Sequence, residues 1–178
     1  MALQKKEYST TLLSDLSVRA LDFLETLPEF IHANIVAVYY AMADEVRTAD
    51  FIEKWAEKKK ILLPLIADDM IRFYTYKGAD SLKSGVFGIL EPVPDEDEYI
   101  CVPDLVVVPG VAFDRQMNRL GRGKGYYDRL FMQFGWREVT RIGLCFHFQL
   151  ISEVPVGEND VRMHHIVTDE TILSGSFS

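Results

Sequence analysis

The hydrophobic positions of the chain switch between helical and strand-like spacing. Residues 12–27 place leucine, alanine and phenylalanine side chains on one helical face, which predicts an amphipathic helix that Pro28 closes. Residues 35–41 (IVAVYYA) form a continuous apolar run, as is typical of a strand buried on both faces. A second helix is expected over residues 49–60, with Thr48 as its N-cap.

The same alternation continues toward the C-terminus. Further strands are expected over residues 61–66, 70–76, 104–110, 141–146 and 164–168. Pro64 places the first of them at an edge or an end of the sheet, because proline cannot donate to a strand ladder. After residues 104–110 a glycine-rich loop leads into a helix from Tyr126 to residue 136. Strands alternating with helices indicate an α/β fold with a mainly parallel sheet, in which ligands bind beyond the carboxyl ends of the strands.

Composition narrows the class of protein. The 178 residues are enough for one domain, and 48% hydrophobic with 26% charged residues argues against disorder. No apolar run approaches the roughly 18–20 residues of a membrane helix, and the first residues lack the apolar core of a secretory signal. We therefore expect a cytoplasmic protein with no membrane partner. Cys101 and Cys145 lie far apart among apolar residues, which predicts buried free thiols.

Charge is distributed unevenly along the chain. The formal net charge of −8 disfavours nonspecific binding of nucleic acid, because the whole molecule repels a polyanion. Residues 114–129 nevertheless carry five cations against two aspartates. The five are Arg115, Arg119, Arg122, Lys124 and Arg129. A local cationic segment in an acidic protein favours a discrete small anion as its ligand.

The glycine-rich loop has the composition of a phosphate cradle. Gly121, Gly123 and Gly125 alternate with Arg122 and Lys124 directly before the expected helix. Glycine permits positive φ, so successive N–H groups can converge, and the helix N-terminus adds further donors. Arginine can bind phosphate bidentately, and lysine supplies a point charge. The pattern is neither a Walker A loop nor GxGxxG, and a plain turn with solvated cations is the alternative.

Asp128 follows in the first turn of that helix. A carboxylate there can simply stabilise the positive end of the helix dipole. It can equally bind Mg²⁺, which at phosphates usually takes one or two carboxylates together with phosphate oxygens. Spacing alone does not decide between these two roles.

Residues 109–131 resemble the signature of the 5-formyltetrahydrofolate cyclo-ligase family. The family pattern PGxxFDxxxxRLGxGxGxYD is matched without a gap at every fixed position. Supporting similarities lie in residues 40–48, 87–94, 143–149 and 154–160, so that the resemblance spans about residues 14–170. It implies a three-layer α/β/α sandwich around a mainly parallel sheet, with residues 1–178 as a single domain.

The resemblance also implies a reaction. Members of this family are ligases that use ATP and Mg²⁺ to cyclise 5-formyltetrahydrofolate to 5,10-methenyltetrahydrofolate, through a phosphorylated formyl group, releasing ADP and phosphate. The partners implied are a reduced folate and ATP, with no nucleic acid, and we expect a monomer.

By position, the resemblance assigns the site residues as follows. Arg122 and Lys124 are catalytic. The ATP-binding residues are Arg119, Leu120, Gly121, Arg122, Gly123, Lys124, Gly125, Tyr126 and Tyr127. The substrate-binding residues are Tyr40, Glu45, Arg122, Gly123, Lys124, Gly125 and Tyr126. Asp128 and Asp160 hold the metal. Without the motif, Tyr40 would be read as a core residue, Glu45 as a loop carboxylate and Asp160 as a turn residue.

Two departures from the family pattern stand out. The family usually begins with a helix that carries Lys-x-x-Leu-Arg, for which Lys5 and Lys6 are poor substitutes by position. We therefore expect either a native start upstream of Met1 or weaker substrate binding. His164 stands where an aspartate is common, and its neighbour His165 should point to the opposite face of a strand, so we do not expect the two to chelate one metal.

The sequence is also compatible with two other functions. One is a nucleotide- or RNA-binding module that uses the same basic, tyrosine-flanked loop. The other is a folate-binding homologue that has lost catalysis.

Overall fold

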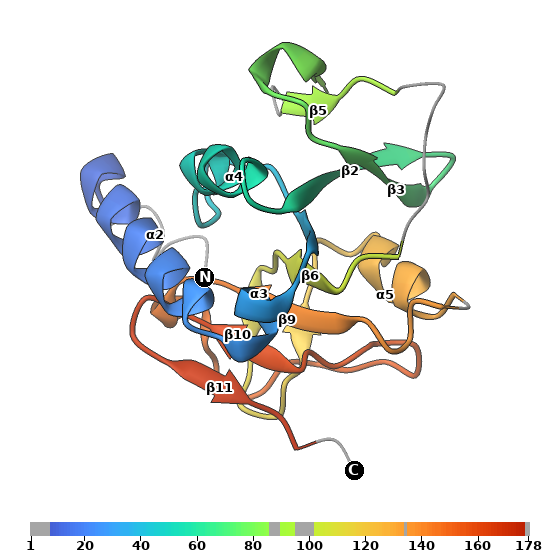
Figure 1. Cartoon of the computed structure of the whole chain (residues 1–178). Helices are drawn as coiled ribbons and strands as arrows, with labels where there is room; N and C mark the ends of the chain where they lie inside the picture. The colour runs from blue at the N-terminus through green and yellow to red at the C-terminus, as the bar shows by residue number, and fades with distance from the viewer. Residues whose placement is uncertain (1–7, 86–89, 95–101, 134, 177–178) are drawn as a thin grey trace.

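The computed structural model describes residues 8–85, 90–94, 102–133 and 135–176, and its centre is a seven-stranded sheet (Figure 1). The strand order is β11-β10-β9-β6-β1-β2-β3. The bounds are β1 (Ile35–Val38), β2 (Lys60–Ala67), β3 (Met70–Thr75), β6 (Leu105–Val108), β9 (Thr140–Leu144), β10 (His165–Val167) and β11 (Ile172–Ser174). The five inner strands pair in parallel, in the order β10-β9-β6-β1-β2. The edge strands β3 and β11 each pair antiparallel to their neighbour.

Helices cover both faces of this sheet, as Figure 1 shows. On one face lie α2 (Thr10–Glu25), α3 (Pro28–His32) and α4 (Ala49–Ala56), and on the other lies α5 (Tyr126–Phe131). Val36 and Val38 of β1 pack in the cluster with α2, α3 and α4, whereas Ala37 between them packs in the cluster with α5. Successive side chains of a strand point to opposite faces, so a strand buried on both sides needs a continuous apolar run. This arrangement confirms the α/β/α layers.

Each predicted helix and strand is found, but several boundaries differ. Pro28 does not only end α2; it also begins α3 at the first helical position, where its missing N–H costs nothing. The strand predicted over 35–41 ends at Val38, and the helix predicted to reach residue 136 ends at Phe131. Thr48 does not cap α4 with its side chain. Its hydroxyl instead donates to the carbonyl of Tyr39 at 2.7 Å and so ties the end of β1 to α4.

The position of β2 corrects the expectation drawn from Pro64. β2 lies between β1 and β3, so it is not an edge strand. However, β1 pairs with β2 only as far as Leu62, and Pro64 lies beyond this parallel ladder. The hairpin from β2 to β3 turns through Asp68 and Asp69, both at positive φ, as in a type I′ turn. Pro64 is tolerated because it lies past the last residue of β2 that pairs with β1.

Some elements were not predicted. A two-stranded sheet joins β4 (Leu82–Ser84) to β5 (Leu90–Pro92), and a ribbon joins β7 (Ala112–Phe113) to β8 (Arg119–Leu120). Cys101, Lys5, Lys6 and part of the 87–94 motif lie outside the described residues. Cys145 is buried, as expected, and forms no disulfide bond within the described ranges. None of the helices in the described part of the chain combines the length and apolar character that crossing a membrane requires.

Asp114 shapes the turn of the β7–β8 ribbon. Its side chain is fully buried, and one carboxylate oxygen accepts the N–H groups of Gln116 at 2.9 Å and Asn118 at 3.0 Å. The other oxygen accepts the side-chain amide of Asn118 at 3.0 Å and the N–H of Val154 at 2.9 Å. Burial alone would raise the pKa of Asp114, but the hydrogen bonds from Val154, Asn118 and Gln116 outweigh it and lower the pKa. The ionised carboxylate thus orients the ribbon that leads to Arg119.

We predict that Asp114→Asn lowers the free energy of unfolding at pH 7 by about 3 kcal/mol, because an amide cannot accept all of these hydrogen bonds. Since the folded-state pKa is depressed, the stabilisation by Asp114 is present above the unfolded value of about 4 and is lost as pH falls through the native pKa. Urea denaturation across this range tests both points. The matched control is Asp15→Asn, an exposed carboxylate on α2. A loss at Asp114 no larger than in the control would contradict the role given to this carboxylate.

Candidate active site

The glycine-rich loop lies beyond the carboxyl end of β6, as predicted. It connects β8 to α5, and Gly125 is the residue that caps α5. Gly123 and Gly125 have φ of +83° and +63°, a region that side chains rarely adopt. Gly121 has a different reason to be glycine, because a Cβ there would lie 2.7 Å from a guanidinium nitrogen of Arg119. The loop thus has the backbone freedom that a phosphate cradle needs at two of its three glycines.

A buried ion pair closes this loop at its base. Arg119 before the loop and Asp128 after it are joined at 2.9 Å, with side chains only 6% and 16% exposed. The guanidinium of Arg119 also donates to the carbonyl of Pro109 at 3.3 Å and lies 5.4 Å from the centre of the Tyr127 ring. Its Nε is buried without a hydrogen-bond partner among the described residues. Arg119, predicted to bind ATP, thus donates from both terminal nitrogens to groups of the protein itself.

Arg122 at the tip of the loop contacts the segment that follows β1. Its Nη2 lies 2.7 Å from a carboxylate oxygen of Asp44 and 3.2 Å from one of Glu45. Glu45 is buried, and its second oxygen accepts the N–H of Met42 at 2.9 Å. Burial would lower the pKa of Arg122, but Asp44 and then Glu45 raise it further above its usual value. The guanidinium therefore remains charged between the two carboxylates.

The sheet explains why these distant segments meet. β1 and β6 are parallel neighbours, so the residues that follow each of them emerge at the same edge. Glu45 and Arg122, which the family resemblance placed at one site, are brought together in this way. Asp44 was missed because an Asp-Glu pair in a loop carries no signal of its own. Tyr40 lies half-buried on the same segment and packs against the core.

Lys124 and the tyrosines complete the loop. Lys124 is exposed, and its carbonyl accepts a hydrogen bond from the guanidinium of Arg129 at 2.8 Å. The same guanidinium lies 5.2 Å from the centre of the Tyr126 ring. Burial raises the pKa of Tyr127, although Arg119 opposes the rise, so that the phenol stays neutral. The backbone around Lys124 is held in place while its ammonium group faces solvent.

The two predicted metal ligands lie on adjoining segments. Asp128 accepts the N–H of Val161 at 3.2 Å, which brings the neighbouring Asp160 toward the start of α5. Asp160 is exposed, and its carboxylate accepts the N–H of Gly157 at 2.7 Å. Within the ranges that the structure describes, no three His, Cys, Asp or Glu side chains form a metal-binding group. Two carboxylates that keep unused lone pairs nevertheless fit Mg²⁺ bound mainly by phosphate oxygens and water.

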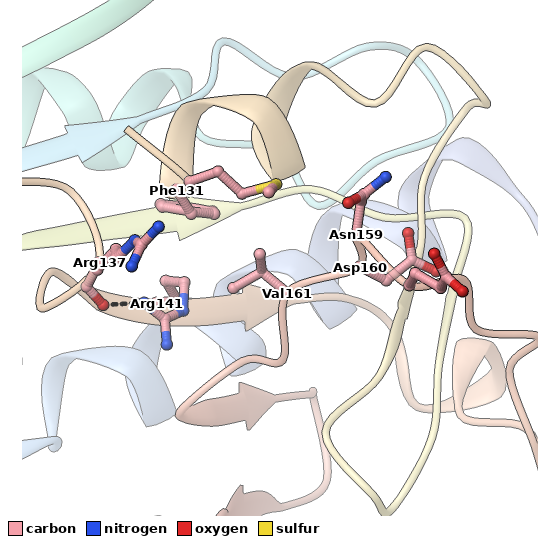
Figure 2. A pocket seen from close by; sticks show the side chains of 8 residues that line it. Phe131, Arg137, Arg141, Asn159, Asp160 and Val161 are labelled. Carbon is pink, nitrogen blue, oxygen red and sulfur yellow. Dashed lines mark hydrogen bonds between the residues drawn. The ribbon is translucent and has the colours of Figure 1, made fainter. Parts of the chain in front are cut away.

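A hollow of about 300 Å³ is lined in part by Asp160 (Figure 2). Its lining comes from the end of α5, the segment before and into β9, and the loop before β10. The lining residues are Phe131, Met132, Arg137, Arg141, Glu158, Asn159, Asp160 and Val161. None of the loop residues 119–127 line it. The hollow is therefore a neighbour of the predicted site on the side of Asp160 and not the phosphate cradle itself.

The histidine pair points in two directions, as expected for neighbours on an extended chain. His164 accepts the N–H of Arg141 at 2.9 Å, and burial together with Arg141 lowers its pKa to about 4. His165 instead contacts Ser174 at 2.9 Å and Glu29 at 3.2 Å. The two rings thus belong to separate polar contacts.

Gln149, part of the Phe-x-x-Gln similarity, holds the backbone that follows β6 through hydrogen bonds. It is buried at the end of the short 3₁₀ helix η3 (His147–Gln149). Its amide nitrogen donates to the carbonyls of Gly110 at 2.9 Å and Val111 at 3.0 Å, and its oxygen accepts the N–H of Phe146 at 2.9 Å. The motif thus fixes the turn after β6.

Comparisons with known proteins identify the family of this chain. The sequence model of the 5-formyltetrahydrofolate cyclo-ligase family matches residues 14–169. The chain is 33% identical over 159 residues to a probable 5-formyltetrahydrofolate cyclo-ligase of Caenorhabditis elegans, covering 81% of this chain and 77% of that protein. It is 29% identical over 153 residues to the 5-formyltetrahydrofolate cyclo-ligase of Escherichia coli K12, covering 83% and 84%.

A solved structure shows the same fold. The NMR structure of the 5,10-methenyltetrahydrofolate synthetase of Aquifex aeolicus superposes with a TM-score of 0.84 at 30% identity, covering 98% of this chain and 89% of that one. The signature loop, the parallel sheet and the matched relatives lead to one assignment. The chain belongs to the 5-formyltetrahydrofolate cyclo-ligase family.

Proposed function

We propose that the chain catalyses the ATP- and Mg²⁺-dependent cyclisation of 5-formyltetrahydrofolate to 5,10-methenyltetrahydrofolate, with release of ADP and phosphate. One observation carries the proposal. Arg122, in the loop suited to phosphate, contacts Glu45, in the segment expected to bind the folate. The two substrates would then meet at a single guanidinium group.

In the first step the formyl oxygen of the folate bonds to the γ-phosphorus of ATP as the bond from phosphorus to the ADP oxygen breaks. A formamide oxygen is a modest nucleophile, so the protein contributes mainly by positioning and by charge neutralisation. The N–H groups between Gly121 and Tyr127 and the positive end of α5 would hold the polyphosphate. Lys124 would neutralise charge on the transferring phosphoryl group, and Arg122 would lie between it and the formyl group.

In the second step nitrogen 10 of the folate bonds to the formyl carbon, which is now strongly electrophilic. The N10 proton is lost, the carbon–oxygen bond breaks, and phosphate leaves with its electron pair. Arg122 and Lys124 would stabilise the departing phosphate as they stabilised its transfer. No covalent bond to the protein is needed. Asp128 and Asp160 would hold Mg²⁺, which when bound neutralises charge on the phosphate oxygens.

We propose that the reaction takes place in the cytoplasm and that the protein acts on small molecules as a monomer. An RNA-binding role for the basic loop is less favoured, because the net charge is −8 and Arg122 already has two carboxylate partners. RNA retention that depends strongly on salt, without ATP consumption, would instead support that role.

The direct test is turnover. Incubation with 5-formyltetrahydrofolate and MgATP should produce the methenyl chromophore and one phosphate per product. Lys124→Ala should lower kcat/KM about 10²-fold or more with an unchanged melting temperature, since the ammonium is exposed and acts on developing charge. The matched control is Arg115→Ala, an exposed cation at the opposite end of β8, which should retain activity. Absence of product at high enzyme concentration rejects the proposal, and full activity of Lys124→Ala rejects the role of that residue.

Substitutions of the two predicted metal ligands should differ in their effect on the stability of the fold. Asp160→Asn should raise the Mg²⁺ concentration needed for half-maximal activity and leave thermal stability unchanged, because Asp160 is exposed. Asp128→Asn should have the same effect on Mg²⁺ and also destabilise the fold by about 3 kcal/mol, since Arg119 loses its buried partner. Magnesium titrations and melting curves of both variants measure this. Equal melting temperatures would contradict the structural part of the role of Asp128, and an unchanged magnesium requirement would contradict the metal role.

A further inference from the structure

The contact between Asp44 and Arg122 has no part in the function proposed above. These residues are 78 positions apart in the chain, and their side chains meet at 2.7 Å, closer than the 3.2 Å between Arg122 and Glu45. Both contacts use the same guanidinium nitrogen, Nη2. Asp44 is therefore the nearer of two carboxylates that hold the arginine of the phosphate loop against the segment after β1.

The two carboxylates differ in how firmly they are held. Glu45 is only 8% exposed, and the N–H of Met42 fixes its other oxygen. Asp44 and Arg122 are 42% and 46% exposed. The Asp44 contact therefore lies at the solvent-accessible side of the cluster, where an incoming phosphate can compete with it.

We propose that Asp44 is a positioning residue, which holds the guanidinium of Arg122 at the boundary between the nucleotide and folate sides of the site. This inference rests on the proposed function. A triphosphate that recruits Arg122 must compete with Asp44, so that the contact lowers the affinity for nucleotide alone. In return, Asp44 restricts the guanidinium to the side of the loop where Glu45 and the folate are expected, and a displacement of about 1 Å can cost a large factor in rate.

The proposal predicts opposite changes in binding and turnover. Asp44→Asn should tighten the binding of MgADP about two- to fivefold, as expected for the loss of a half-exposed ion pair. It should lower kcat at saturating substrates about tenfold, because the guanidinium is no longer restricted. A variant that merely unfolds loses both binding and turnover, so the two effects cannot arise from loss of the fold.

A double-mutant cycle identifies Arg122 as the group through which Asp44 acts. MgADP affinity is measured by calorimetry for the wild type, Asp44→Asn, Arg122→Ala and the double variant. In the Arg122→Ala background, Asp44→Asn should no longer change the affinity. Asp50→Asn, which removes the same charge from the exposed first turn of α4, is the control and should behave as the wild type.

Each outcome decides the question. Unchanged MgADP affinity in Asp44→Asn, tighter binding without loss of turnover, an effect that persists without Arg122, or an equal effect in Asp50→Asn overturns the role of Asp44. A wild-type protein that neither binds MgADP nor forms the methenyl product shows instead that the proposed function has failed. The two failures are therefore distinguishable.

Discussion

The ion pair between Arg119 and Asp128 is the contact on which the geometry of the candidate site depends. It joins the residue before the glycine-rich loop to the first turn of the helix after it, so that the intervening residues form a closed loop. Burying two charges is costly and adds stability only when the remaining groups are satisfied. Here the N–H of Val161 donates to the second oxygen of Asp128, and the carbonyl of Pro109 accepts a further hydrogen bond from Arg119. The Nε of Arg119, however, is buried without a hydrogen-bond partner among the described residues. The pair therefore matters more for where it holds the loop than for the stability it adds.

The parallel sheet brings the second half of the site to this loop. β1 and β6 lie side by side with the same direction, so the segments that follow them share one edge. Gln149 and Thr48 fix the backbone at these two strand ends, each through hydrogen bonds to carbonyl groups. Arg122 and Glu45 can then meet although they are 77 residues apart. The site is thus assembled from loops whose starting points are set by buried strands.

The features that could be predicted from the sequence are those that depend on local pattern. The strand β6 is a continuous apolar run, and the glycines at 123 and 125 permit the positive φ found there. The features that escaped prediction depend on contacts between distant segments. The β7–β8 ribbon forms because the buried carboxylate of Asp114 collects donors from its own turn and from Val154.

The same distinction applies within the site. The family resemblance assigned Arg119 to ATP binding by its position in the loop motif. The structure places that side chain against Asp128 and leaves Arg122 and Lys124 as the more exposed cations. Asp44 could not be found from the sequence, since its significance arises only when β1 and β6 are known to be neighbours.

We propose that the backbone N–H groups and cations from Arg119 to Tyr127 form the receptacle for the triphosphate of ATP. The decisive measurement is a crystal structure with MgADP and 5-formyltetrahydrofolate. We expect phosphate oxygens within hydrogen-bonding distance of the N–H groups of this loop and of the Lys124 ammonium, with the folate beside Glu45. Phosphates bound instead in the hollow beside Arg137 and Arg141, with the loop untouched, would contradict it.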